Sequence, residues 1–284
     1  MNLFRKAIRK LLREAIILQA RGLGPQTFAR IIEDLNGKAT TVTAVPGGTI
    51  RFYTPSQLLI ERAETLVSKE KDTIEWIESF EENSVFWDVG ANVGTYSLYA
   101  ATSRPVMTLA FEPLAANYHV LNRNIQLNEL CNRVQAYCVA FSKDTQLGIL
   151  SSPVPTMGAA INQFGTSCEV SRYWEGNAIC SEQGMIGISI DDFVERFHPS
   201  FPNFIKMDVD GLEVEILHGA KKTLKDQRLK SLLVELNLTA RDEYDCALLL
   251  LQKAGFTLVS SGERQGTKSQ VASNHIFKRI GSSF

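Results

Sequence analysis

The sequence lacks the features that mark several large classes of protein. Its 284 residues include only five cysteines, which form no C-x-x-C pair and do not cluster with histidine. We therefore expect no disulfide framework and no cysteine-bound metal, but reduced thiols in a cytoplasmic protein. The apolar run at 15–18 is far shorter than the ~20 residues of a membrane span. It is also shorter than the roughly 7 residues of a secretory apolar segment.

An excess of charge of one sign is also lacking. The chain has 30 basic and 31 acidic residues, a formal net charge of −1, and 44% of its residues are hydrophobic. These values are typical of a soluble globular protein with one large or two modest domains. Proteins that bind nucleic acid over a broad surface usually carry a basic excess, so a nucleic-acid partner is not expected.

One stretch, V-F-W-D-V-G-A-N-V-G-T-Y at 85–96, carries most of the information. It predicts a buried strand, a glycine turn and the start of a helix. Gly90 and Gly94 lack a Cβ and allow a sharp turn close to a ligand, while Asn92 tolerates left-handed dihedral angles. The first N–H groups of the helix, from Thr95, would face the crevice beyond the strand, where open α/β sheets bind nucleotides.

Asp88 indicates which ligand that crevice would bind. The dinucleotide fingerprint G-x-G-x-x-G surrounds a pyrophosphate with neutral glycines, whereas D-x-G-x-x-x-G places a carboxylate before the turn. That carboxylate would repel a diphosphate but suits an ammonium or sulfonium group. Glu112 follows a second predicted strand, 106–111, 24 residues after Asp88, where an acid is expected to bind a ribose diol. S-adenosylmethionine fits both carboxylates; a strand–turn–helix junction without a ligand is the alternative.

A third predicted strand, 134–141, would end over the adenine. No acidic residue stands there to receive the adenine amino group, so backbone groups or the Ser142 hydroxyl would have to do so. The expected cofactor-binding residues are Asp88, Gly90, Ala91, Asn92, Gly94, Thr95, Glu112, Pro113, Ala140, Phe141 and Ser142.

Strands and helices alternate from residue 85 onward, as in a parallel sheet covered by helices on both faces. Ser189 is a predicted N-cap, with Asp192 three residues on. Further strands are expected at 204–208 and 231–237, a closing antiparallel pair at 256–260 and 274–279, and helices from 95, at 114–127, from 189, at 212–224 and at 243–254.

Residues 1–80 are predicted to form a cap on a catalytic domain of residues 81–284. In 1–21, apolar residues recur at helical spacing among basic ones. Such a segment can lie on an anionic membrane surface, or it can pack on its own domain or on the second subunit of a homodimer; the sequence favours packing. The other expected elements are a short helix at 27–35, a hairpin at 39–53 and helices at 57–67 and 70–80.

Residues 151–187 interrupt the alternation of strands and helices. The segment is rich in glycine, serine and proline, and long unpatterned insertions of this kind are usually binding loops or lids. Its aromatic residues can stack on a sugar or a planar substrate, or they can hold the loop in place. The large apolar side chains in it are Met157, Phe164, Tyr173 and Trp174.

Taken together, these motifs resemble the FkbM family of S-adenosylmethionine-dependent methyltransferases. The likeness runs from about residue 70 to 237 and rests on D-V-G-A-N-V-G at 88–94, F-E-P at 111–113 and K-M-D-V-D-G-L-E at 206–213. It implies a class I methyltransferase fold, which is a Rossmann-like sheet of seven mostly parallel strands. It also implies O-methylation of a hydroxyl on a sugar, glycolipid, polysaccharide or secondary metabolite. Asp210 departs from the family, which usually has glutamate there.

Transfer to a hydroxyl requires a group that removes its proton. Asp208 and Glu235 are expected at the ends of neighbouring strands above one crevice, with Asn237 nearby, and His275 is the most suitable of four histidines. Asp208 can instead orient the cofactor or cap the next helix. Asp208, Glu235 and Asn237 also offer oxygen ligands of the kind that Mg²⁺ prefers, but a side-chain base is favoured over a metal.

Two other functions are compatible with the sequence. An RNA methyltransferase is disfavoured by the neutral charge and by the absence of an RNA-binding module. The other is a nicotinamide-dependent oxidoreductase or a non-catalytic nucleoside-binding protein. Titration with S-adenosylhomocysteine against NAD separates this hypothesis from the two methyltransferase functions. The expected partner is a small-molecule or glycan acceptor.

Overall fold

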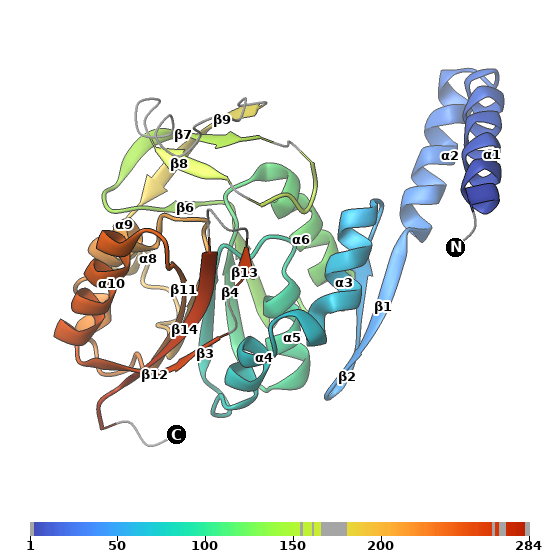
Figure 1. The fold of residues 1–284 in the computed structure, drawn as a ribbon. Helices are drawn as coiled ribbons and strands as arrows, with labels where there is room; N and C mark the ends of the chain where they lie inside the picture. The colour runs from blue at the N-terminus through green and yellow to red at the C-terminus, as the bar shows by residue number, and fades with distance from the viewer. Residues whose placement is uncertain are drawn as a thin grey trace. The chain divides into compact units, whose positions relative to one another are not determined.

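The computed structural model describes residues 3–153, 156–160, 162–165, 181–262, 265–266 and 271–281 (Figure 1). The chain forms two compact units, Met1–Thr40 and Thr41–Phe284. The smaller unit contains two helices, α1 (Leu3–Arg21) and α2 (Pro25–Lys38). Gly24 has a left-handed φ of 79° and Pro25 occupies the first turn of α2, so the chain changes direction there. No helix among the described residues is long and apolar enough to cross a membrane.

The larger unit is built on one long sheet with the strand order β12-β14-β11-β10-β3-β4-β5. Strands β11, β10, β3, β4 and β5 are parallel, and β14 is antiparallel to β11, β12 and the short β13. This arrangement confirms the predicted class I methyltransferase fold. The bounds are β3 (Val85–Val89), β4 (Met107–Phe111), β5 (Val134–Tyr137), β10 (Phe204–Met207), β11 (Ser231–Asn237), β12 (Phe256–Ser261), β13 (Gln265–Gly266) and β14 (Val271–Arg279).

Successive strand residues point to opposite faces of the sheet and fill two separate cores. Phe86 and Phe204 pack with α4, α5 and α6, whereas Trp87 and Ile205 pack with α8, α9 and α10. Because both faces are covered, the central strands are almost continuously apolar. The helix bounds are α4 (Lys71–Glu78), α5 (Thr95–Ser103), α6 (Ala115–Leu127), α8 (Ile190–Phe197), α9 (Glu213–His218) and α10 (Arg241–Lys253).

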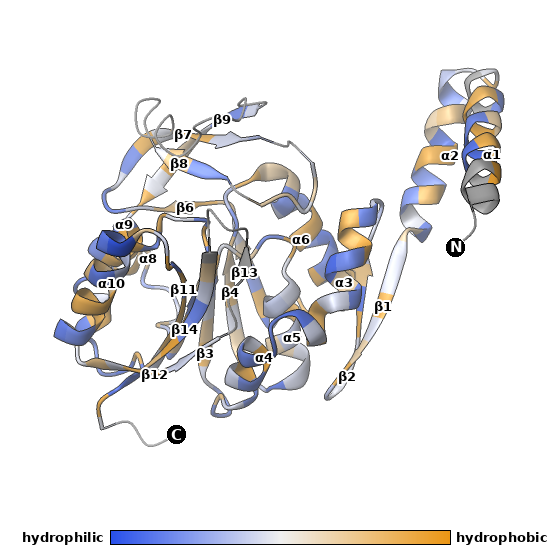
Figure 2. Cartoon of the chain, viewed as in Figure 1, coloured by the Kyte–Doolittle hydropathy of each residue, from blue (hydrophilic) through white to orange (hydrophobic). Residues whose placement is uncertain are grey.

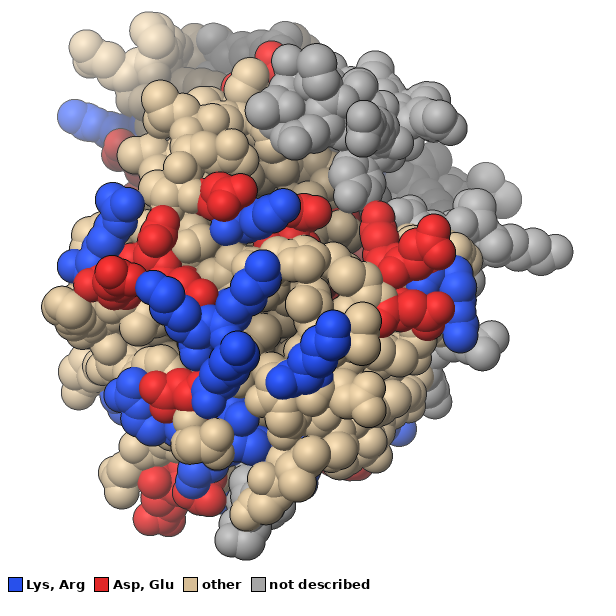
Figure 3. All heavy atoms as spheres, turned by 90° about the vertical axis from the view of Figure 1, so that its left-hand side faces the viewer, with Lys and Arg blue, Asp and Glu red and all other residues tan. Residues whose placement is uncertain are grey.

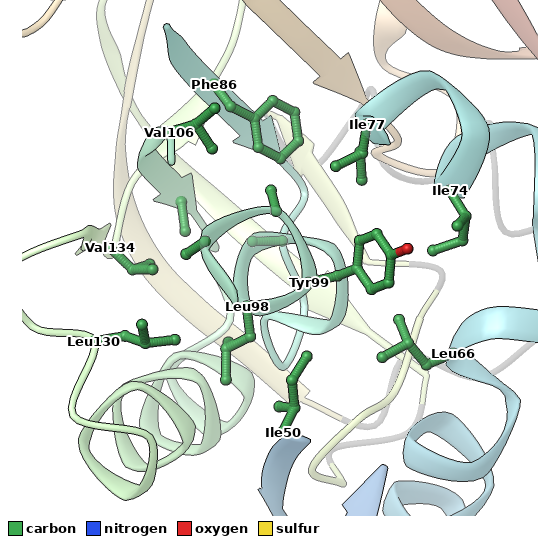
Figure 4. Packing of buried hydrophobic residues seen from close by; sticks show 14 of the residues in the cluster. Ile50, Leu66, Ile74, Ile77, Phe86, Leu98, Tyr99, Val106, Leu130 and Val134 are labelled. Carbon is green, nitrogen blue, oxygen red and sulfur yellow. The ribbon is translucent and has the colours of Figure 1, made fainter. Parts of the chain in front are cut away.

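Residues 41–80 lie in the larger unit, whereas the sequence predicts a domain boundary at residue 80. They form the predicted hairpin and helices, β1 (Thr40–Val45), β2 (Gly48–Tyr53), α3 (Gln57–Lys69) and α4. Ile50, Leu66 and Ile77 belong to the same core cluster as Leu98 and Tyr99 of α5 (Figure 4). The segment therefore completes the core on the α5 face of the sheet.

A second sheet corrects two sequence predictions. The expected strand 134–141 is two strands in different sheets, and part of the expected loop 151–187 is β-structure. Glycines in this segment resemble loop residues in the sequence but make room for the Phe164 ring in the sheet. A Cβ at Gly187 would lie 2.3 Å from that ring, and a Cβ at Gly148 would lie 2.6 Å from it. The sheet contains β6 (Ala140–Phe141), β7 (Gln146–Ser152), β8 (Gln163–Gly165) and β9 (Ser181–Ile188) in the order β6-β9-β7-β8. Tyr173 and Trp174 lie outside the described residues.

The helices that follow the second sheet begin largely as predicted. The Ser189 hydroxyl accepts a hydrogen bond from the Asp192 N–H at 3.1 Å and caps α8. The helix expected at 212–224 is shorter, because α9 ends at His218 and a 3₁₀ turn follows at Thr223–Lys225. At the break, a Cβ on Gly219 would lie 2.4 Å from the Ser142 carbonyl oxygen, so the chain packs against the neighbouring loop there.

Candidate active site

A cleft of about 530 Å³ opens at the carboxyl ends of β3, β4, β10 and β11. This volume is within the range of about 300–1,000 Å³ that is common for small-molecule sites. Helix α3 forms one wall and the second sheet contributes another. Eight of the predicted cofactor-binding residues line the cleft, namely Gly90, Ala91, Asn92, Thr95, Glu112, Pro113, Ala140 and Phe141. Asp88, Gly94 and Ser142 do not.

Asp88 lies beneath the glycine turn and not in the cleft. Its side chain is 1% exposed, and its Oδ2 accepts a hydrogen bond from the Ser97 hydroxyl at 2.6 Å. Burial raises the pKa of Asp88, and the neighbouring Lys206 opposes that rise. Lys206 lies directly opposite Asp88 in the β3–β10 register. Asp88 therefore acts through the groups around it and does not touch the ligand space.

The two glycines of the turn are required by close packing. Gly90 and Gly94 have left-handed φ angles of 83° and 84°. A Cβ on Gly90 would lie 1.9 Å from the Asp208 carbonyl oxygen, and one on Gly94 would lie 2.4 Å from Leu121 of α6. The sequence interpretation, in which both glycines admit a ligand, is therefore incomplete: they primarily admit the end of β10 and the side of α6.

Glu112 joins the turn to the end of β4. Its Oε2 accepts a hydrogen bond from the Asn92 N–H at 2.8 Å, and its Oε1 accepts one from the Leu114 N–H at 2.9 Å. Only 3% of the side chain is exposed, and burial raises the pKa of Glu112 to about 7 although these amides oppose the rise. A carboxylate fixed in this way at the cleft floor suits a pair of ribose hydroxyls.

An apolar surface continues from Glu112 toward the second sheet. Phe111, Pro113, Phe141, Leu150 and Phe164 line this part of the cleft, which suits a planar base. The Ser142 hydroxyl donates to the Asp144 carbonyl at 2.6 Å, so Ser142 does not supply the predicted adenine contact.

Two polar groups remain unpaired at the cleft. Asn92 and Asn162 both line it. The Oδ1 atom of each is buried and has no hydrogen-bond partner among the described residues. Unpaired buried acceptors are costly, and a bound nucleoside with hydroxyl and amino donors would satisfy them. The side chains present therefore fit an adenosine-containing cofactor.

The opposite end of the cleft is charged. The Lys206 ammonium is 2.7 Å from Oδ2 of Asp208, and the Lys206 side chain is 2% exposed. Burial alone would raise the pKa of Asp208, but Lys206 outweighs it and holds that pKa below its ordinary value. The Lys206 ammonium also lies 5.0 Å from the centre of the Tyr96 ring. Asp208 is thus an ionised carboxylate at the tip of β10.

Glu235, unlike Asp208, carries a proton. The charge of Asp208, followed by burial, raises the pKa of Glu235 to about 9, so it is protonated near neutral pH. The carboxyl oxygens of Asp208, Asp210 and Glu235 lie within 4.8 Å of one another. Asn237 is not part of this group, because its Oδ1 accepts hydrogen bonds from the N–H and hydroxyl of Thr239. Asp210 takes the place in the oxygen cluster that the sequence predicts for Asn237.

His275 lies away from the cleft. Its ring is 5.4 Å from that of Tyr244 on α10, and its Nδ1 is 2.8 Å from the Ser273 carbonyl oxygen. Burial lowers the pKa of His275. The neighbouring Asn274 faces the other side of the strand and donates to Oε2 of Glu70 at 3.0 Å. The structure therefore does not bring His275 to the place that the sequence predicts for a base.

Sequence reasoning missed several cleft residues, and strand alternation could have revealed one of them. Lys206 is two residues from Asp208 and thus on the same face of β10. Glu70 and Tyr96 also line the cleft, and so do Arg62 and Lys69 of α3. Arg62, Lys69 and Glu70 carried no comparable signal, because no pattern in the sequence indicates that α3 and its C-terminal cap cover the strand ends.

The described part of the inserted segment is fastened beside α3 and α6. The Arg62 Nε donates to the Gly158 carbonyl at 2.9 Å. The Asn117 Nδ2 donates to the Ala159 carbonyl at 3.0 Å, and the Asn92 Nδ2 donates to the same oxygen at 2.9 Å. The segment is thus held by the turn that also forms the cofactor end of the cleft.

Comparisons with known proteins bear on the family of the chain. The methyltransferase FkbM domain matches residues 88–258. Hexuronic acid methyltransferase AglP of Haloferax volcanii is 28% identical over 204 residues, which cover 70% of this chain and 75% of that protein. Methyltransferase 1 of Beauveria bassiana is 26% identical over 192 residues, which cover 64% and 76%.

A solved structure with a similar fold is precorrin-6y C5,15-methyltransferase from Geobacter metallireducens. It is 14% identical with a TM-score of 0.44, over 80% of this chain and 93% of that one, a distance too great to bear on the reaction. The FkbM match, in contrast, spans more than half of the sequence. The chain therefore belongs to the FkbM family of S-adenosylmethionine-dependent methyltransferases.

Proposed function

We propose that this methyltransferase transfers the methyl group to an oxygen, a hydroxyl on a sugar, glycolipid, polysaccharide or secondary metabolite. The observation that carries the proposal is the ionised Asp208, paired with Lys206 at 2.7 Å, in the same cleft as Glu112 and the glycine turn. A relative named as a hexuronic acid methyltransferase supports a sugar acceptor in particular.

The cofactor would occupy the end of the cleft near Glu112. Glu112 would accept the ribose hydroxyls, Pro113 and Phe141 would contact the base, and the unpaired oxygens of Asn92 and Asn162 would accept from the bound molecule. S-adenosylmethionine supplies an electrophilic methyl group on a sulfonium. The chain itself positions the acceptor and removes a proton.

Asp208 would accept the proton of the acceptor hydroxyl. As the oxygen lone pair forms its bond to the methyl carbon, the O–H becomes strongly acidic, so a carboxylate of low pKa is a sufficient base. The proton would pass to Asp208, and S-adenosylmethionine would supply the methyl group and keep the electron pair of the C–S bond on its sulfur. Lys206 keeps Asp208 ionised before the reaction, while protonated Glu235 can donate a hydrogen bond to the acceptor. Arg62 and Lys69 offer positive charge to an acidic sugar.

The test is a methyl-transfer assay with a uronic acid and with the matching neutral sugar. We expect a methyl ether that resists mild alkali, and we expect Asp208→Asn to lower kcat by about 10²–10⁴-fold with little change in cofactor affinity. Asp245→Asn, on the exposed side of α10, is the matched control. An alkali-labile methyl ester made equally well by Asp208→Asn would contradict the proposal, because a carboxylate acceptor needs no base.

A further inference from the structure

The helical pair of residues 1–40 exposes much of its apolar surface. In α2 no residue is buried, and Phe28 and Ile31 are only partly covered. Two helices of this length cannot build a stable core alone, so an apolar surface of this size requires a covering partner. Figure 2 shows hydrophobic bands along both helices. The exposed large apolar side chains are Ile8, Leu11, Leu12, Ile16, Leu18, Leu23, Ile32 and Leu35, which are 40–74% exposed.

The same segment has a charge unlike that of the rest of the protein. Residues 1–40 contain eight basic and three acidic residues, although the whole chain has a formal net charge of −1. In α1, residues 8, 11, 12, 15 and 18 form one apolar stripe by helical spacing, and the exposed Lys10 and Arg13 lie outside this stripe and form what we call the basic line. Basic residues that flank an apolar stripe are the pattern of a helix at an anionic lipid surface.

The surface of the larger unit offers a contrast. On the face over α8, η1 (Thr223–Lys225) and α10, basic and acidic side chains lie next to one another (Figure 3). Lys222 pairs with Glu195 at 2.9 Å, and Arg228 pairs with Asp226 at 2.7 Å. Some of the charge on that face is therefore paired, and by residue count the basic excess of the chain lies in residues 1–40.

We propose that residues 1–40 are a peripheral membrane-binding hairpin that lies on an anionic lipid surface. A lipid bilayer offers both an apolar interior for the stripe and negative charge for the basic line. A second copy of the hairpin would cover the stripe but would bring two strongly positive segments together. Nucleic acid would match the charge but would leave the apolar stripe in water. This proposal departs from the preference for packing that the sequence alone suggests, because only a lipid surface matches both the stripe and the basic charge.

The experiment is co-sedimentation of the full chain with two kinds of vesicle. One kind contains phosphatidylcholine and the anionic lipid phosphatidylglycerol, and the other contains phosphatidylcholine alone. We expect binding to the anionic vesicles only. Leu11→Asp with Leu18→Asp, and separately Lys10→Glu with Arg13→Glu, should each weaken binding about tenfold or more. Leu147→Asp is the matched control, because Leu147 is 81% exposed on β7 and its replacement should change nothing.

Other binding partners of the hairpin would give distinct results. A dimer in sedimentation velocity that Leu11→Asp with Leu18→Asp dissociates, without vesicle binding, would assign the stripe to a second copy. A lowered melting temperature in that variant, again without vesicle binding, would assign it to the protein's own larger unit. An RNA mobility shift lost with the basic residues would assign it to nucleic acid. Each of these outcomes, or equal loss of binding in Leu147→Asp, overturns the proposal.

Discussion

Two carboxyl groups on the cleft floor are held in different protonation states by their nearest neighbours. Glu112 is surrounded by backbone amides and apolar groups, and burial raises its pKa to about 7. Asp208 is also surrounded by protein, but the ammonium of Lys206 keeps its pKa below the ordinary value. In the function we propose, the same residue class would therefore serve ligand recognition at one end of the cleft and proton transfer at the other.

Binding of S-adenosylhomocysteine should depend on pH through Glu112. Ribose hydroxyls donate to the ionised form, whereas the free protein takes up a proton as the pH falls through about 7. Affinity should therefore rise on the order of tenfold between pH 6 and pH 8, as expected for one coupled proton. Calorimetric titrations across this range measure it. Glu112→Ala should weaken binding at least about tenfold and abolish the pH dependence.

Glu213 provides the matched control for that experiment. Its carboxylate also accepts two backbone N–H groups, from Val209 and Gly211, and burial raises its pKa to about 7, yet it does not line the cleft. Glu213→Gln should keep the pH dependence of S-adenosylhomocysteine binding. Loss of that dependence in Glu213→Gln would contradict the assignment of Glu112 as the group that causes it. Glu112→Ala should also lower the unfolding free energy by about 1–3 kcal/mol, since two buried amides lose their acceptor.

Chelation of metal ions should leave activity unchanged. Asp208, Asp210 and Glu235 bring carboxyl oxygens together as a cation site would, but Lys206 already lies 2.7 Å from Asp208 and its positive charge opposes a second cation. We therefore expect full turnover after dialysis against EDTA. Inactivation by EDTA that Mg²⁺ reverses would show that a metal activates the acceptor.

At the scale of secondary-structure elements, the second sheet depends on glycines that accommodate one aromatic ring. Gly187→Ala would place a methyl group 2.3 Å from a carbon of Phe164 and should destabilise the fold by about 1–3 kcal/mol, the usual cost of overpacking. Thermal unfolding measures the effect. Gly184→Ala lies on the same strand with nothing within 4 Å of its Cβ position, and it should be neutral. Equal losses in both variants would indicate a general effect on β9.

The main sheet was predictable from sequence because its strands are apolar on both faces and end in recognisable motifs. Asp88, Glu112 and Asp208 mark three of these ends, and the structure places all three at the same edge of the sheet. The second sheet was not predictable, because Gly148 and Gly187 indicate loops unless the position of Phe164 is known. His275 was misplaced for a related reason: a strand's sequence does not say which of its two faces meets the cleft.

At the scale of the whole molecule, the charge is divided between the two compact units. The basic excess lies in residues 1–40, while the larger unit, which contains the cleft, carries the compensating acidic excess. An anionic surface should therefore attract the hairpin and repel most of the larger unit. Binding should weaken as salt rises, and vesicle sedimentation between low and high ionic strength measures this. Salt-independent binding would mean that the apolar stripe alone provides the affinity.

A hairpin that holds the enzyme on a surface also changes how it meets its acceptor. If the acceptor is a glycolipid, enzyme and acceptor diffuse in the same two-dimensional layer, and the relevant concentration is the mole fraction of acceptor among the lipids. Diluting the acceptor with inert lipid at constant bulk concentration should then slow the wild-type enzyme. The Leu11→Asp, Leu18→Asp variant, which would act from solution, should be governed by bulk acceptor concentration instead. The exposed stripe of α1 would thus determine the dimensionality of the enzyme's search for its substrate.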